Sequence, residues 1–559
     1  MPALNTTRTL LATALLATVA ACGGGNDSAP PPQADVAPKA TLVGRFAHNV
    51  SAGSAEIVAH HLRSQSVFIT VDTASTPNAF QRVSLRNLGS TALSSPTSAS
   101  NLESGAITSV ASHVNDSGFT AGGVQTLAIS GDLLAIAVRA TPKTDPGVVA
   151  FYRLDAQGNA TYLSKVTVGS LPDGMAFSPD GGQLVVANEG EIDGNENFVL
   201  APDKSNDPLG TISIIAINNG TPAANATTLD FTAFDSGGSR ASELPNDVRI
   251  GIAGNDFSRD AEPEYVSINE DGKTAYVTLQ ENNAVAVVNL ETKRIDRLIA
   301  MGYKDHGLPA NALAPSDRVA ADAPFALKSY ANLYGIYMPD AIASFSVNGT
   351  PYFITANEGD DRDDFLATAE TGRVSSLSLD PTAFPNASAL RANTELGRLT
   401  VIRTMGRNSN NQYEKLYALG GRSFSIYNAS TGQQVYDSGS ELERIAYSTL
   451  PASLLGAAQV LGRLDNKGPE PESVVVGTIG NKPYAFVALE RSSAILMYDL
   501  SKPAAPVFVQ WLQNTSTLDD GDISPEGLAF VPAAQSPTGK PLLLAGHEVS
   551  GTLAVWEMQ

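Results

Sequence analysis

PDGMAFSPDGGQLVVANE, residues 172–189, is a stretch of two short strand-like runs joined by a turn. It opens with a proline and Asp173, and it closes with Glu189. Asp180-Gly181-Gly182 in the middle is typical of turns that close β-hairpins. The stretch therefore predicts one antiparallel hairpin with an acidic residue at each end.

The same plan occurs five times along the chain. The separations between the opening acid and the closing glutamate are 16, 17, 18, 18 and 22 residues. Residues equidistant from a hairpin turn face each other about 5 Å apart, so we expect the two acids of each repeat to lie side by side. The opening acids are Asp173, Glu264, Asp340, Glu472 and Glu526, and the closing glutamates are Glu189, Glu281, Glu358, Glu490 and Glu548.

These repeats predict an all-β fold, a β-propeller of about seven blades with long loop insertions. Many short strands indicate a sandwich, a barrel or a propeller, and an internal repeat favours the propeller. Residues 41–170 supply one or two further blades with a weaker signature. We expect the strand at 41–46 to pair with the strand at 552–557 and close the ring. The remaining length is assigned to insertions at 192–262, 300–338 and 360–468.

A ring of such hairpins would gather carboxylates on one rim. Such a cluster needs a cation, an arginine, or carboxyl groups with a raised pKa. Calcium fits best, because it takes several oxygen ligands with flexible geometry. Glu191, Asp360 and Asp361 follow two closing glutamates and are further candidate ligands. The alternatives are a purely structural ring of salt bridges and, for the loop after Glu358, a solvated acidic loop.

Three arginines are candidates for anion binding: Arg362, Arg422 and Arg491. A guanidinium group matches phosphate oxygens, and metal with arginines would make phosphoester hydrolysis chemically possible. The alternative is that each arginine pairs with a neighbouring acid. No catalytic residue can be assigned, because the chain lacks the HExxH, GxSxG and Walker motifs.

Composition limits the partners. The chain of 559 residues carries 57 acidic against 36 basic side chains, a net charge of -21, which argues against nucleic acid. Its single cysteine excludes a disulfide scaffold and a thiolate zinc cluster.

The N-terminus has the features of a lipoprotein signal. Residues 1–21 hold one early cation and an apolar run too short to span a bilayer, as in a signal peptide. Val19-Ala20-Ala21-Cys22 resembles the bacterial lipoprotein box, which predicts lipidation of Cys22 and a membrane anchor. Residues 23–40 indicate a flexible tether before a propeller at 41–559. We expect the bacterial cell envelope, at the outer membrane or the cell surface. The alternative is an ordinary signal peptide with a chance cysteine.

Five segments resemble the choice-of-anchor I family: 172–191, 339–363, 421–443, 467–490 and 525–556. The resemblance covers residues 41–559. It implies a surface-attached β-propeller that binds calcium in a binding or scaffold role, with a surface ligand as partner. Because many members are labelled alkaline phosphatase-like, the alternative it implies is a calcium-dependent phosphatase or phosphodiesterase acting on a phosphoester. The stretch before Lys467 lacks the acidic run of the family, which reduces any cation site there, although Asp465 keeps one carboxylate.

Overall fold

The structure is a computed structural model that describes residues 37–48, 53–318 and 325–559. The predicted signal peptide, Cys22 and most of the predicted tether lie outside the described residues. Within the described part, none of the helices combines the length and apolar character needed to cross a membrane.

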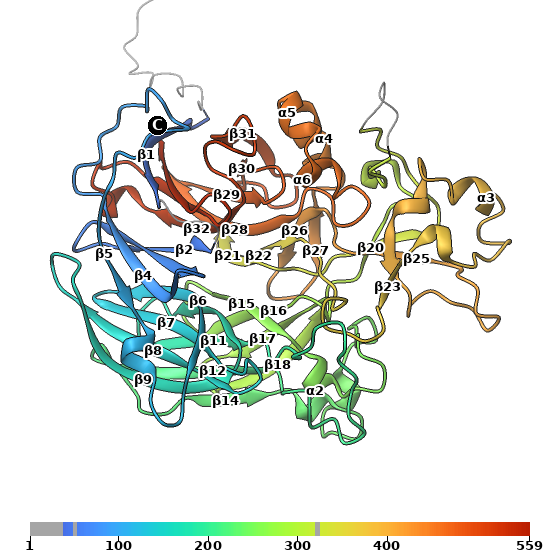
Figure 1. Ribbon diagram of the computed structural model, residues 1–559, viewed down its shortest axis with the longest axis horizontal. Helices are drawn as coiled ribbons and strands as arrows, with labels where there is room; N and C mark the ends of the chain where they lie inside the picture. Colours follow the sequence, from blue (N-terminus) through green and yellow to red (C-terminus); the bar gives the residue numbers. More distant parts are fainter. Residues whose placement is uncertain (1–36, 49–52, 319–324) are drawn as a thin grey trace, which may run out of the picture. The chain divides into compact units, whose positions relative to one another are not determined.

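In the part of the chain that the structure describes, seven antiparallel sheets form the blades, six of four strands and one of five (Figure 1). Blade 1 contains β2 (Ser54–His61), β3 (Ser66–Thr73), β4 (Thr76–Ser84) and β5 (Glu103–Ser109). Blade 2 contains β6 (Ala121–Ser130), β7 (Leu133–Ala140), β8 (Pro146–Leu154) and β9 (Ala160–Ser170). Blade 3 contains β10 (Pro172–Phe177), β11 (Gln183–Asn188), β12 (Thr211–Asn218) and β14 (Thr227–Asp230), with β13 (Thr221–Pro222) beside β12. Blade 4 contains β15 (Pro263–Ile268), β16 (Thr274–Leu279), β17 (Ala284–Asn289) and β18 (Arg294–Ala300).

The remaining blades follow in chain order. Blade 5 contains β21 (Ile342–Val347), β22 (Thr350–Asn357), β26 (Ser423–Asn428) and β27 (Gln434–Asp437). Blade 6 contains β28 (Pro471–Ile479), β29 (Lys482–Leu489), β30 (Ala494–Asp499) and β31 (Val507–Gln513). Blade 7 contains β32 (Pro525–Val531), β33 (Leu542–His547), β34 (Thr552–Met558) and β1 (Ala40–Ala47).

The first strand of each blade contacts the first strands of its two neighbours. These innermost strands follow one another in the order β32, β2, β6, β10, β15, β21 and β28, and β28 contacts β32 again. The ring is therefore a closed seven-bladed propeller, as the repeats predict. Blade 7 combines both ends of the described chain, because β1 pairs antiparallel with β34 from Ala40 opposite Met558 to Ala47 opposite Thr552. The predicted closing pair is confirmed.

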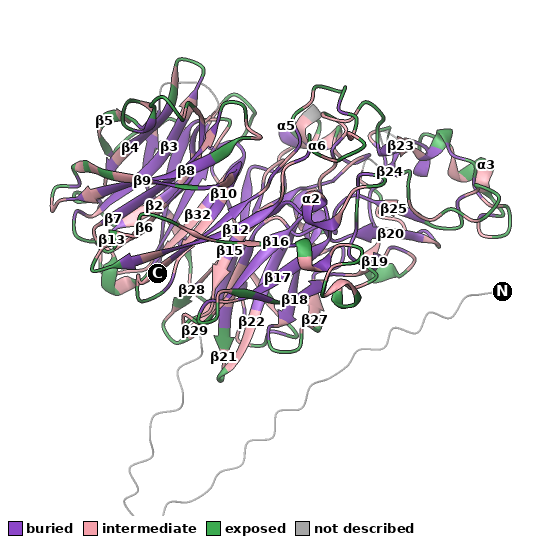
Figure 2. Ribbon diagram, turned by 90° about the horizontal axis from the view of Figure 1, so that it is seen from below, coloured by how far each residue is buried: buried purple, intermediate pink, exposed green. Residues whose placement is uncertain are grey.

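Hydrophobic layers between neighbouring blades form the core. Val185 and Ile212 of blade 3, for example, pack with Val277 and Ala286 of blade 4. Figure 2 shows the blade strands mostly buried and the loops at their ends mostly exposed. Full burial of one such aliphatic side chain contributes about 1.5–3 kcal/mol, so the layers between blades carry much of the stability.

Two features of the backbone bring the innermost strands together. The residue before the proline is left-handed in four repeats, with φ of 45° at Leu171, 46° at Met338, 50° at Glu470 and 59° at Ser524. Such values are uncommon for residues other than glycine, so four repeats share a kink at the entrance to the inner strand. Gly174 follows an opening acid, and a Cβ there would lie 2.2 Å from the carbonyl oxygen of Glu264 in the next blade.

The insertions differ in part from the prediction. A separate sheet pairs β19 (Tyr303–Asp305), β20 (Leu333–Ile336), β25 (Leu416–Ala418), β24 (Thr400–Ile402) and β23 (Thr371–Arg373), and Figure 1 shows part of it beside α3 (Ala387–Leu390). However, the predicted insertion at 192–262 contains β12 and β14, and that at 360–468 contains β26 and β27. The repeat motif covers only the two inner strands of a blade, so long loops hid the outer strands.

Short helices complete the described chain. The α-helices besides α3 are α1 (Ala111–Val114), α2 (Phe257–Asp260), α4 (Glu441–Thr449), α5 (Ala452–Leu455) and α6 (Ala458–Leu461). The 3-10 helices are η1 (Thr232–Phe234), η2 (Ala241–Glu243), η3 (Pro309–Asn311), η4 (Val374–Ser376), η5 (Leu396–Arg398) and η6 (Ala533–Gln535). The helices α4 to α6 lie between blades 5 and 6 in the sequence, and residues of α4, α5 and α6 pack against the core between those blades.

Candidate functional site: an acidic axial cavity

A cavity of about 370 Å³ lies where the innermost strands meet. All seven blades line it, and each contributes one acidic or amide side chain from its inner strand or from the two residues before that strand. Six of these side chains are acidic and one is a glutamine. In blade order they are Glu56, Gln125, Asp173, Glu264, Asp340, Glu472 and Glu526. The structure thus brings together all five predicted opening acids, which belong to blades 3 to 7.

Further carboxylates come from the ends of the second strands and the loops that follow them. Glu358, Asp360, Glu490 and Glu548 also line the cavity. With the six acids of the inner strands, this makes ten carboxylates, against two cationic side chains, Lys467 and Arg491. The lining contains no histidine or cysteine. The cavity is therefore a concentrated set of oxygen donors with a large excess of negative charge.

The register of the hairpins differs from the mirror pairing that the spacing predicts. Pro172, Pro471 and Pro525 pair with the residue before the closing glutamate, and an irregularity follows each proline. The backbone N–H of Glu189 donates to Leu171 at 2.9 Å, so this glutamate faces the residue before the proline rather than Asp173. The prediction of direct cross-strand neighbours is wrong. The carboxylates still interact, because burial and then the charge of Asp173 raise the pKa of Glu189.

Electrostatics in the cavity oppose ionisation. Burial, and then the neighbouring carboxylates, raise the pKa of Glu264, Glu472 and Glu526 well above its ordinary value. The same causes raise the pKa of Glu56 to about 8. Burial raises the pKa of Asp173 to about 6. A cation bound among these groups would reverse the effect, because it favours the charged form of each carboxyl group.

Several buried carboxylate oxygens have no hydrogen-bond partner among the described residues. Those in or near the cavity include the Oε2 atoms of Glu264, Glu281 and Glu472. Glu281 is only 5 % exposed. Buried polar groups are normally hydrogen-bonded, so these oxygens are available to a bound water or cation. Oxygen-only donors without nitrogen or sulfur fit a hard cation.

Two groups of three carboxylates have ligand atoms within 4.8 Å of one another. The first group is Asp340, Glu358 and Glu472, and the second is Glu358, Glu470 and Glu490. Glu358 belongs to both. Its Oε2 accepts a hydrogen bond of 2.9 Å from Nε2 of Gln280, and its Oε1 lies 2.6 Å from Nζ of Lys467.

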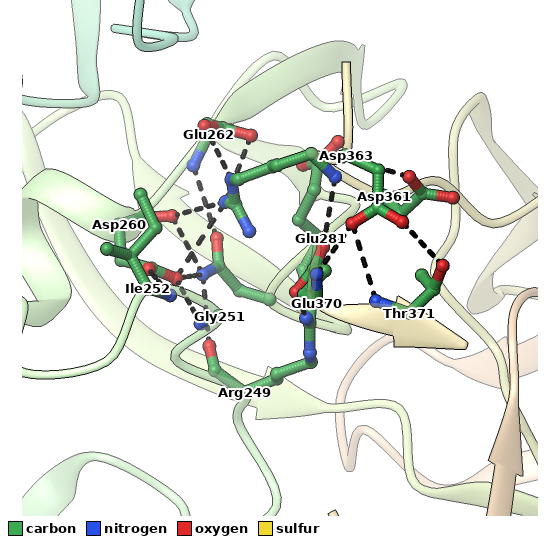
Figure 3. Close-up of polar contacts among 12 residues, drawn as sticks. Arg249, Gly251, Ile252, Asp260, Glu262, Glu281, Asp361, Asp363, Glu370 and Thr371 are labelled. Atoms are coloured by element: carbon green, nitrogen blue, oxygen red, sulfur yellow. Dashed lines mark hydrogen bonds and ion pairs between the residues drawn. The ribbon is translucent and has the colours of Figure 1, made fainter. Parts of the chain in front are cut away.

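Arg362 has a structural role instead of the predicted anion-binding role. Its Nε and Nη2 each lie 3.0 Å from a carboxylate oxygen of Glu262, and Nη2 also donates to the backbone oxygen of Asp260 at 3.0 Å. Arg249 pairs with Glu370, whose other oxygen accepts the backbone N–H of Arg362. Figure 3 shows polar contacts of this network, with Arg249, Asp260, Glu262 and Glu370 among the labelled residues.

Arg422 is likewise corrected. It is 1 % exposed, and Nη1 lies 3.1 Å from Glu443 of α4, while Nη2 donates to backbone oxygens of Leu464 and Asn466. An arginine so enclosed cannot receive an external anion. Only Arg491, of the three candidates, reaches the cavity.

Four predicted ligands lie outside the cavity lining. Glu191 forms an ion pair with Lys143, and burial with nearby acids raises its pKa to about 7. Glu281 is buried close to the Arg362 network, and Asp361 caps the backbone N–H of Asp363 at 3.0 Å. Glu189 is the fourth. These residues add negative charge near the cavity without lining it.

The sequence pattern missed nine residues of the cavity lining, of which five bear on the site. Glu56 and Gln125 stand at the acid position of blades 1 and 2, where no proline precedes them. Gln280, Lys467 and Tyr265 also line the cavity. Glu56 follows a left-handed alanine, Ala55, with φ of 57°. A search for an acid at the start of each inner strand, without the proline, would have found it.

The fold and the site define a β-propeller with a carboxylate-rich axial cavity. Residues 58–503 match the choice-of-anchor I domain, and the chain belongs to this family. Membership indicates a cell-surface β-propeller. The chain is 30% identical over 184 residues to Gigasin-3a of Magallana gigas. That match covers 29% of this chain and 65% of the relative, so the chain spans just under two thirds of its length.

Solved structures with low sequence identity were also compared. The hydrazine synthase of Kuenenia stuttgartiensis is 11% identical, with a TM-score of 0.43 and coverage of 91% of this chain and 97% of that chain. The β-propeller domain of Cps50 (Swd1) from Myceliophteria thermophila is 7% identical, with a TM-score of 0.42 and coverage of 93% and 100%.

Proposed function

We propose that this protein is a surface β-propeller that binds calcium in its axial cavity and uses the calcium-loaded form in a binding or scaffold role. The observation that carries the proposal is the convergence of ten carboxylates from the blades on one cavity with only two cationic side chains. Such an arrangement costs folding free energy when the carboxylates are charged, unless a cation binds among them.

The donor chemistry favours calcium over other metals. Zinc prefers histidine and cysteine ligands, which the lining lacks. Magnesium demands a small octahedral shell and retains several waters, whereas calcium takes six to eight oxygens in flexible geometry. Asp340 and Glu472 supply such oxygens, and no protein group donates a hydrogen bond to either carboxylate among the described contacts.

Phosphoester hydrolysis at the same cavity is the second candidate, and it has less support. It needs cationic groups free to hold phosphoryl oxygens beside the metal. Arg362 and Arg422 are buried in structural ion pairs, and Arg491 is bound to Glu470 at 2.8 Å and to Glu490 at 2.7 Å. A binding role requires no such group. Turnover of a phosphoester that Glu358→Gln abolishes would favour the hydrolase instead.

Lipid attachment at Cys22 is the proposed link to the membrane. The support is the sequence Val19-Ala20-Ala21-Cys22 directly after an apolar run. We expect Cys22→Ser to move the protein from the membrane fraction to the soluble fraction and to prevent incorporation of labelled fatty acid. Unchanged membrane association would contradict the anchor.

The test of the calcium proposal is a thermal melt of the full chain in chelator, in calcium and in magnesium. A ligand of the folded state raises the melting temperature as its concentration passes the dissociation constant. We expect a calcium-specific rise in the wild type and little rise in Glu472→Gln. The matched control is Glu291→Gln. Glu291 is an exposed glutamate in the turn between β17 and β18 of blade 4, and it pairs with Lys273. Equal melting temperatures in chelator and calcium would contradict the proposal.

A further inference from the structure

The two sets of three carboxylates described above differ in how many cationic side chains contact them. The set Glu358, Glu470 and Glu490 is contacted by three cationic side chains, which are Arg463, Lys467 and Arg491. Arg491 lies 2.8 Å from Glu470 and 2.7 Å from Glu490, and Arg463 forms an ion pair with the other oxygen of Glu470. Glu470 has no exposed surface, while the two arginines remain partly exposed. Three carboxylates therefore face three cations.

Lys467 is the cation that connects this group to the other one. Its Nζ lies 2.6 Å from Oε1 of Glu358, 3.1 Å from Asp360 and 4.0 Å from Glu470. The side chain is 9 % exposed. Lys467 is thus held among three carboxylates, and a lysine ammonium group is positively charged at neutral pH.

The group Asp340, Glu358 and Glu472 has no such set of partners. Among the described contacts, the carboxylates of Asp340 and Glu472 receive no hydrogen bond, and Oε2 of Glu472 is buried without a partner. Among the described contacts, the cation that touches this group is Lys467, through the shared Glu358, and the charge of Arg491 acts on Glu472 from farther away. An added ion gains most where negative charge is least compensated, so the two groups are unequal as cation sites.

From this contrast we propose that Lys467 acts as a built-in cation that competes with calcium for Glu358, and that it directs the ion to Asp340 and Glu472 while limiting its affinity. This inference rests on the proposed calcium binding. It adds a residue that sets the affinity and the place of the ion. The ammonium nitrogen and a metal ion cannot both lie within contact distance of Oε1 of Glu358 without strong repulsion.

The test is calorimetric titration of calcium into the full chain, with Lys467→Met as the main variant. Lys328→Met is the matched control, because Lys328 also pairs with a glutamate, Glu395, at 2.6 Å, but in the inserted region away from the cavity lining. We expect Lys467→Met to bind calcium at least about tenfold more tightly than the wild type, which corresponds to about 1.4 kcal/mol. We expect Lys328→Met to match the wild type.

The outcomes separate the inference from the proposed function. If the wild type and Lys467→Met both bind calcium with affinities within twofold of each other, the proposed role of Lys467 is overturned. The proposal that the protein binds calcium then still stands. Absence of calcium binding in both proteins overturns both proposals. Binding by Lys467→Met alone supports the built-in cation and contradicts calcium binding by the wild type.

A second pair of variants tests the place of the ion without removing Lys467. We expect Glu472→Gln to abolish calcium binding and Glu490→Gln to leave the affinity within about threefold, because only Glu472 belongs to the less neutralised group. Circular dichroism in chelator confirms that each variant is folded. The reverse order of effects would overturn the assignment, even if Lys467→Met did not fold.

Discussion

The Arg362 network and the axial cavity are two buried acidic regions that the protein treats in opposite ways. In the network, Glu262 and Glu370 contact Arg362 and Arg249 at hydrogen-bonding distance, and a carboxylate oxygen of Asp260 lies 3.8 Å from Arg362. In the cavity, ten carboxylates face two cations. The difference shows that the chain uses arginine where buried carboxylates only hold loops together. At the axis, where all seven blades meet, carboxylates instead outnumber cations ten to two.

The largest expected effect is a loss of stability when the Arg362 network loses its arginine. Arg362→Ala leaves Glu262 and Asp260 buried without their cation, and breaking a buried pair in this way costs about 3–5 kcal/mol. We expect urea unfolding of the metal-free protein to show a loss of this size. A loss below about 1 kcal/mol would mean that the network contributes little to the free energy of unfolding.

Neutralising the cavity should have the opposite sign. Asp340→Asn and Glu472→Gln each remove a charge that burial and neighbouring acids disfavour, so each should stabilise the metal-free protein at pH 8. Each should also remove the calcium stabilisation, which is about 2.7 kcal/mol when calcium exceeds the dissociation constant a hundredfold. Urea unfolding with chelator and with calcium measures both effects. Destabilisation of the metal-free protein by both variants would remove the contrast between the two regions.

The pH dependence sharpens the same contrast. The folded protein retains protons on cavity carboxyls that the unfolded chain loses near pH 4.5, because their pKa is raised, to about 8 for Glu56 and about 7 for Glu490. The state that binds more protons is favoured at lower pH, so the stability of the metal-free protein should fall as pH rises from about 4.5 to 8. Calcium should restore stability most at the upper end. The measurement is the melting temperature in chelator across this pH range. A melting temperature that stays constant or rises with pH would contradict the account.

The smallest effect concerns the single glutamine of the ring. Gln125→Glu would give every inner strand an acid, and the added like charge should lower the metal-free stability at pH 8 by about 1 kcal/mol. The loss should shrink when calcium is present. Comparison of unfolding midpoints with Gln157→Glu, a change at a turn of blade 2, checks that the effect depends on the cavity.

Much of the fold could be predicted from the repeats, because each repeat contains a complete hairpin with its own turn. The closing pair of Leu42 and Trp556 followed from having an unpaired strand at each end. The outer strands of blades 3 and 5 could not be predicted, since long loops separate them from the repeat. The site was predicted less completely, because Glu56 lacks the proline and Lys467 lies in a loop with no pattern. The buried roles of Arg362 and Arg422 depend on distant partners that spacing does not reveal.

Terbium luminescence tests the central claim most directly, because this oxygen-binding ion resembles calcium and emits when a nearby tyrosine transfers energy to it. Tyr265 lines the cavity beside the inner-strand acids. We predict saturable terbium emission on tyrosine excitation, displaced by calcium, and largely lost in Tyr265→Phe while calcium still raises the melting temperature of that variant. Emission that calcium does not displace, or that Tyr265→Phe leaves unchanged, would contradict a calcium site in the axial cavity.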